Sequence, residues 1–178
     1  MIILGVDPGT ICTGYGIIRY INNELIYIGS GIIMPPKVKE LPPRLEVIYD
    51  SLLDVIKKYR PDEFALETAF YGKNVQSTMK IGYARGVSML AAIHGKLRIS
   101  EYSPREIKKS VVGKGSSSKE QIQFMIKTLL GIDVTKMKLD ETDALAVAVC
   151  HALQNTLVKP KGKSWKAFLD ANPDRIIQ

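Results

Sequence analysis

The chain has 178 residues, 46% of them hydrophobic and 24% charged, which suffices for the core of one domain and excludes two full ones. Its 25 Lys and Arg exceed its 18 Asp and Glu, and the net charge of +7 favours a polyanionic partner such as nucleic acid, although it also serves solubility. The two cysteines have neither metal-ligand nor disulfide spacing and no segment is typical of a signal peptide or membrane span, so we expect a cytoplasmic protein.

Three strands are expected at the start of the chain. Residues 2–7 are a short apolar run that ends in an acid, which is typical of a buried central strand. Residues 14–20 and 24–33 are rich in strand-forming residues and are separated by a turn at residues 21–23. These three strands are predicted to form a meander.

The rest of the chain is predicted to alternate helices and strands. In order, we expect a helix that follows Pro42-Pro43 and ends at a break at 60–62, a strand at 64–67, a helix at 74–94, a strand at 97–102 and a brief helix capped by Ser103-Pro104. A Gly/Ser-rich loop at 111–118 and helices at 118–130 and 141–157 are expected after it. This order predicts an α/β domain with a five-stranded mixed sheet and helices on both faces. The domain is expected to span residues 1–157, followed by a loosely attached basic tail at 158–178.

Four acids stand at the edges of these apolar elements. Asp7 follows the first strand and Glu67 the fourth, and open α/β sheets bind ligands outside the carboxyl ends of their strands. Asp140 and Asp143 are three residues apart, which places both on one helix face near its first turn. Clustered carboxylates repel one another unless a cation offsets their charge. Magnesium prefers oxygen ligands, and a pair of ions can clamp the attacking and leaving oxygens of a phosphodiester.

Each acid also has an ordinary structural explanation. Asp7 precedes Pro8-Gly9 and suits a turn, and Glu67 suits an exposed strand end. Asp140 suits a helix N-cap, and Asp143 suits the favourable field of a first helical turn. The spacing by itself does not bring the four side chains together.

Five segments carry recognisable motifs. They are Gly5-Val6-Asp7-Pro8-Gly9-Thr10 with Thr13-Gly14-Tyr15-Gly16, Ala65-Leu66-Glu67-Thr68-Ala69-Phe70 with Lys73-Asn74, Gly82-Tyr83-Ala84-Arg85-Gly86-Val87, Lys108-Lys109-Ser110-Val111-Val112-Gly113-Lys114-Gly115 with Lys119, and Asp140-Glu141-Thr142-Asp143-Ala144-Leu145-Ala146. Together and in this order they resemble the RuvC family of four-way (Holliday) junction resolvases, in the ribonuclease H-like superfamily. The match is collinear from residue 2 to about residue 155.

The resemblance implies a ribonuclease H-like fold, a homodimer, and paired symmetric nicks in strands of like polarity at a four-way junction, in homologous recombination and DNA repair. By position, Asp7, Glu67, Asp140 and Asp143 would bind two magnesium ions, with manganese as an alternative, and Lys119 would lie near the scissile phosphate. Some family members carry a histidine where Asp140 stands, so this chain keeps an all-carboxylate site. The resemblance also suggests RuvA and RuvB as partner proteins.

The resemblance implies further DNA contacts. Phe70 is expected to stack on an unpaired base at the junction centre, with packing against a helix as the alternative. The expected set is Phe70, Tyr71, Lys73, Lys108, Lys109, Lys114 and Lys119. The last four flank a Gly/Ser-rich loop, which can follow a phosphate chain or be a solvated loop. Arg85 pairs with an acid or with phosphate, and Trp165 anchors the tail or contacts a partner; the residues alone do not separate these readings.

Two glycines on the long helix are candidates for a helix contact. Gly82 and Gly86 are four residues apart, so both lie on one face and allow a second helix to approach closely. That helix belongs either to the same chain or, as the resemblance supports, to a twofold-related subunit. His94 and His151 are interpreted as ordinary helix residues because neither has a ligand pattern nearby.

Three other functions are weighed against a junction nuclease. A sugar-kinase or actin-like ATP binder shares the core fold and the Asp-x-Gly-Thr turn, but it needs two lobes where this chain has one. A non-catalytic nucleic-acid binder would have mutated acids, and all four are present here. A smaller relative that acts on ribosomal RNA precursors is close in fold, and only the resemblance separates it from a resolvase.

Overall fold

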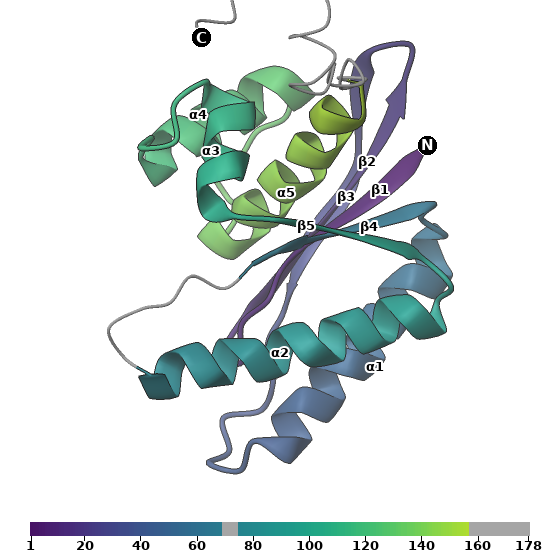
Figure 1. Cartoon of the computed structure of the whole chain (residues 1–178), viewed down its shortest axis with the longest axis vertical. Coiled ribbons are helices and arrows are strands. Elements are labelled where there is room, and N and C mark those ends of the chain that lie inside the picture. Colours follow the sequence, from purple (N-terminus) through teal and green to yellow (C-terminus); the bar gives the residue numbers. More distant parts are fainter. Residues whose placement is uncertain (69–74, 157–178) are drawn as a thin grey trace, which may run out of the picture.

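The computed structural model describes residues 1–68 and 75–156, and places a sheet between two helical layers (Figure 1). In chain order the elements are β1 (Ile2–Asp7), β2 (Thr13–Ile21), β3 (Glu24–Ile33), α1 (Pro42–Tyr59), β4 (Glu63–Glu67), α2 (Val75–His94), β5 (Arg98–Tyr102), α3 (Pro104–Val112), α4 (Lys119–Leu130) and α5 (Leu139–Thr156). Every predicted strand and helix is present. Within these described residues, no helix has both the length and the apolar character needed to cross a membrane.

Several boundaries differ from the prediction by one or two residues, among them the start of α5 at Leu139 and the end of α3. Helix α3 continues through Val112, so the loop expected to start at residue 111 begins later. Its start is stabilised by a capping box between Ser103 and Glu106, and its end is set by Gly113, whose φ of 84° places it in the left-handed conformation that glycine favours. The helical stop signal is therefore the glycine rather than the two valines before it.

The sheet is mixed, as predicted, with the order β3-β2-β1-β4-β5. β1 pairs antiparallel with β2, and β2 with β3, through a two-residue turn in which Asn22 and Asn23 both have positive φ. β1 pairs parallel with β4, and β4 with β5. The carboxyl ends of β1, β4 and β5 therefore lie at the same edge of the sheet (Figure 1).

Side chains alternate between two hydrophobic cores, one on each face of the sheet. Leu4, Phe64 and Leu66 belong to the core formed with α1 and α2. Ile3 and Ala65 belong to the core formed with α3, α4 and α5. Because side chains of a strand alternate with a period of two, the odd-numbered residues of β1 and β4 point toward α5. Helices cover both faces, which confirms the predicted layers.

Glycines let the buried helix α5 lie directly against the sheet. A Cβ atom on Gly5 would stand 2.3 Å from the backbone oxygen of Ala144, and one on Gly14 would stand 1.8 Å from the backbone oxygen of Asp140. Real Cβ contacts are never this short, so larger residues there would push the start of α5 away. These glycines therefore set where Asp140 and Asp143 lie.

Candidate active site

A pocket of about 270 Å³ lies at the sheet edge where β1 and β4 end, beside α3, α4 and α5. It is lined by Asp7, Glu67, Pro104, Ile107, Lys108, Lys119, Ile122, Asp143 and Ala146. Asp7 and Glu67 follow the paired residues Val6 and Leu66, and their odd numbers turn both side chains toward α5. Three of the four predicted acids thus line one pocket with two of the predicted lysines.

The two strand-end acids of the pocket hold their protons unusually tightly. Burial, and after it the charges of Asp143 and Asp140, raises the pKa of Asp7 to about 7. Burial, and after it the charges of Asp7 and Asp143, raises the pKa of Glu67 to about 8. Lys119 acts in the opposite direction on both pKa values. The four acids therefore share one electrostatic environment in which negative charge is in excess.

Lys119 is the first residue of α4, and its side chain reaches the acids. The start of α4 is held by a capping box between Ser118 and Gln121. The ammonium Nζ of Lys119 donates to Oδ2 of Asp143 at 2.8 Å, and this hydrogen bond raises the pKa of the lysine. Lys108, on α3, lines the same pocket and lowers the pKa of Glu67.

Asp140 lies beside the pocket, on the side of the loop that follows β1. It forms a hydrogen bond with Cys12, whose pKa is raised to about 11 by burial first and by this contact second. Lys138 lies close enough to Cys12 to oppose that shift in pKa. Cys12 and Lys138 were not predicted as neighbours of the site, although Cys12 lies between the two parts of the first motif.

The loop that carries Asp7 into β2 is held by contacts from its own backbone and from α1. Thr13 Oγ1 accepts from the Gly9 backbone N–H at 3.2 Å and donates to the Gly9 carbonyl at 2.8 Å. The guanidinium group of Arg44 donates to the carbonyl of Thr10. Arg44 lies 34 residues from Thr10, so no local pattern predicted this contact.

The residues present suit a hard divalent cation. All four acids offer carboxylate oxygens, which magnesium, calcium and manganese accept and which zinc or copper sites usually supplement with sulfur or nitrogen. Within residues 1–68 and 75–156, no group of three or more His, Cys, Asp or Glu side chains is arranged so that it could hold a metal ion as it stands. Lys119 holds Asp143 instead, so that a cation would have to exchange with this ammonium group. That the acids bind metal stays a prediction.

The other predicted DNA residues are only partly placed. Phe70, Tyr71 and Lys73 lie outside the described residues. Lys109 and Lys114 are exposed near the pocket without lining it.

The glycines predicted to meet a second helix lie on α2. Gly82 and Gly86 are on its exposed face, where a Cβ atom would find open space. No helix of the described part of the chain packs there.

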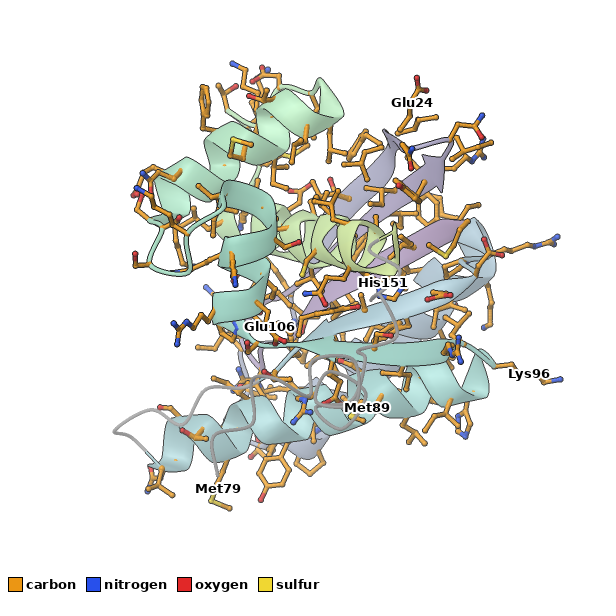
Figure 2. All side chains as sticks on the ribbon, turned by 45° about the horizontal axis from the view of Figure 1, so that its top comes forward. Glu24, Met79, Met89, Lys96, Glu106 and His151 are labelled. Atoms are coloured by element: carbon orange, nitrogen blue, oxygen red, sulfur yellow. The ribbon has the colours of Figure 1, made fainter. Side chains whose placement is uncertain are left out.

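Arg85 and His151 each have defined partners in the structure. Arg85 donates to Glu101, so the acid reading of Arg85 is confirmed. His151 is fully buried, with Nε2 2.5 Å from Glu63 and Nδ1 2.7 Å from the hydroxyl of Tyr102. It lies on helix α5, as expected, and its two ring nitrogens join that helix to the sheet (Figure 2).

Comparison with known proteins supports the resemblance. The family described as "Crossover junction endodeoxyribonuclease RuvC" matches residues 3–151. Proteins named crossover junction endodeoxyribonuclease RuvC from Chloroherpeton thalassium and Salinibacter ruber are 42% and 43% identical to this chain, in each case over the full length of both chains. The structure of T. thermophilus RuvC in complex with a Holliday junction substrate is similar with a TM-score of 0.82 at 25% identity, covering 88% of this chain and 96% of that one.

The family predicted from the five motifs is thus confirmed by full-length relatives, and the ribonuclease H-like fold by the structural match. One lobe and a complete set of acids had already argued against the kinase-like and non-catalytic alternatives. The chain belongs to the RuvC family of crossover junction endodeoxyribonucleases.

Proposed function

We propose that this chain is a crossover junction endodeoxyribonuclease that resolves four-way DNA junctions by paired nicks, in recombination and repair. Family membership supports the reaction, and the pocket at the sheet edge supports its chemistry. The observation that carries the proposal is that Asp7, Glu67 and Asp143 line one pocket with Lys119, and that burial and then neighbouring acids raise the pKa of Asp7 and of Glu67. Such an excess of buried negative charge is suited to binding divalent cations.

Asp7, Glu67, Asp140 and Asp143 are the residues that would hold two magnesium ions, with manganese as an alternative. Bound ions would supply Lewis-acid stabilisation of the attacking and leaving oxygens of the phosphodiester. Asp7 and Glu67 would face them from adjacent strands, and Asp143 from the first turns of α5. The strands and the close packing of α5 against them would hold these carboxylates at fixed positions relative to one another.

The lysines of the pocket would act on the DNA phosphate. Lys119, at the start of α4, would place positive charge beside the scissile phosphate as its oxygens become more negative. Lys108 would contact the backbone from the α3 side of the same pocket. Phe70, Tyr71, Lys73, Lys109 and Lys114 stay predicted DNA contacts on the strength of the motifs.

A homodimer is supported by an apolar stripe on the outer face of α2. The stripe consists of Val75, Met79, Gly82, Tyr83, Gly86, Leu90 and Ile93, all exposed. It lies opposite the buried residues Ala84, Ser88 and Ala91, and Figure 2 shows Met79 projecting away from the sheet. An exposed apolar stripe on one helix face favours an interface, and a twofold pair of subunits suits two symmetric nicks. RuvA and RuvB stay partners suggested by the family alone.

The experiment that tests this function compares a synthetic four-way junction with a linear duplex of the same sequence, each with EDTA or with Mg²⁺. We expect paired nicks near the branch point of the junction only with Mg²⁺, and little cutting of the duplex. Asp7→Asn is expected to bind the junction and to lose cleavage by roughly a hundredfold or more, because a charged group of the pocket is lost. Cleavage of both substrates at equal rates, or without metal, would contradict the proposal.

A further inference from the structure

Lys119 and Asp143 form an ion pair inside the acid pocket. Nζ of Lys119 lies 2.8 Å from Oδ2 of Asp143, whose side chain is 14% exposed, whereas the lysine side chain is 57% exposed. The same ammonium group interacts with the charges of Asp7 and Asp140. Lys119 is thus a counter-ion to the same carboxylates that are proposed to hold divalent cations.

A divalent cation and the ammonium group need the same carboxylate. Two cations within a few ångströms of one oxygen repel each other, and the repulsion is stronger in a site with limited access to water. The exposed fraction of Asp143 leaves little solvent to screen them. A divalent cation that binds Oδ2 of Asp143 therefore has to displace Lys119.

The lysine can move while the fold stays as it is. Lys119 begins α4, and the capping box between Ser118 and Gln121 holds that helix start independently of the lysine side chain. More than half of the lysine side chain is exposed, so rotation of its torsions can carry Nζ toward solvent or toward bound DNA. The exchange needs no movement of the sheet or of α5.

We propose that a divalent cation displaces Lys119 from Asp143, and that the released ammonium group then binds a DNA phosphate. This inference rests on the proposed function of the pocket. The cation binds Asp143 and the DNA phosphate binds Lys119, so that each ligand binds one member of the ion pair. Metal and junction therefore strengthen each other's binding through this pair, and by linkage the effect is reciprocal.

The first test measures metal binding without DNA. Titration calorimetry with Mn²⁺ at pH 8.5 is expected to show that Lys119→Met binds roughly threefold to tenfold more tightly than the parent, because the competitor is gone. Lys119→Arg keeps a competing charge and is expected to stay near the parent value. Lys108→Met, a lysine of the same pocket without this ion pair, controls for the general loss of positive charge and is expected to change less. Equal or weaker Mn²⁺ binding by a folded Lys119→Met protein would overturn the proposal.

The second test measures junction affinity by fluorescence anisotropy, in EDTA and in Ca²⁺ as a hard cation used in place of Mg²⁺. The parent is expected to bind the junction more tightly in Ca²⁺ than in EDTA. The ratio of these two affinities is expected to be about threefold or more smaller in Lys119→Met than in the parent. Lys108→Met is expected to weaken junction binding in both conditions and to leave the ratio of the two affinities as it is in the parent. The same affinity ratio in Lys119→Met as in the parent would overturn the proposal that the cation displaces Lys119. Failure of the parent to nick junctions with Mg²⁺ would instead reject the proposed function.

Discussion

Asp7 and Glu67, two of the predicted metal ligands, both have folded-state pKa values far above those of exposed acids. The pKa of Asp7 is raised from 3.8 to about 7 and that of Glu67 from 4.5 to about 8, by burial first and by neighbouring acids second. A carboxyl group that binds its proton more tightly in the folded chain stabilises the fold at low pH. That stability is fully present below the unfolded pKa and is lost as the pH rises through the folded pKa.

The metal-free protein is therefore expected to become less stable between about pH 4 and pH 8. Urea unfolding in EDTA should give a free energy of unfolding lower by about 2 to 4 kcal/mol at pH 8.5 than at pH 5. Glu67→Gln should show a smaller decline, because the glutamine cannot ionise. Excess Mg²⁺ should restore stability at pH 8.5 more than at pH 5, since metal binds the deprotonated acids. Identical pH dependence of the parent and Glu67→Gln would contradict this account.

His151 joins α5 to two strands through a buried hydrogen-bonded chain. Burial lowers the pKa of His151, so the ring is neutral at physiological pH, and its Nε2 faces the carboxylate of Glu63. We infer that Nε2 carries the proton and that Nδ1 accepts from the hydroxyl of Tyr102. The carbonyl of Tyr102 in turn accepts from the N–H of Thr68, the residue after Glu67.

Removing the Tyr102 hydroxyl should destabilise the protein measurably. In Tyr102→Phe a buried ring nitrogen loses its donor, and we expect a loss of about 1 to 3 kcal/mol in the free energy of unfolding. Tyr49→Phe is a matched control, because Tyr49 makes the same type of contact with His94 in a more exposed position. Urea unfolding of both variants tests this, and equal losses would show that the burial of His151 is not what matters.

The element that positions the candidate site is α5, whose backbone lies directly against glycines of β1 and β2. Gly14→Ala would place Cβ 1.8 Å from the backbone oxygen of Asp140, so the first turn of α5 must shift. We expect a loss of about 1 to 3 kcal/mol in stability and a fall in junction cleavage of roughly tenfold or more. The cleavage rate at saturating junction checks this under conditions where the variant is folded. Cleavage by Gly14→Ala at the parental rate would show that the contact between β2 and α5 tolerates a side chain at this position.

At the scale of the whole molecule, the apolar stripe on α2 is expected to hold two subunits together. Leu90→Glu places a charge within the stripe and is expected to convert a dimer to a monomer, as measured by light scattering after size exclusion. Lys80→Glu is exposed on the same helix but lies off the stripe, so it is expected to leave the dimer intact. A parent protein that is already monomeric at micromolar concentration would contradict the interface.

Loss of the dimer should uncouple the two nicks, so that they no longer occur together. Each subunit carries its own pocket, so a monomeric Leu90→Glu protein is expected to keep weak cutting of single strands while losing simultaneous cutting of a pair. A supercoiled plasmid carrying an extruded cruciform distinguishes these outcomes, since unpaired nicks relax it and paired nicks make it linear. Linear product at the parental rate would show that the stripe is not needed for paired cutting.

The order and type of the elements were determined by the sequence itself. Apolar spacing is local, so the continuous apolar run of residues 2–7 and the period of the helix after Pro43 predicted the correct structures. The acids were identified because Asp7, Glu67 and the pair at the start of α5 stand in motifs whose order is specific. Helices on both faces followed from strands that alternate with helices.

Only the tertiary structure decided which side chains meet. His151 and Glu63 are 88 residues apart, and Lys119 and Asp143 are 24 apart, so no local pattern could pair them. The contacts of Cys12 with Asp140 and of Arg44 with Thr10 likewise depend on how α5 and α1 pack against the first loop. Periodicity reports which face of an element is buried, whereas the partner on that face is set by the packing of the whole chain.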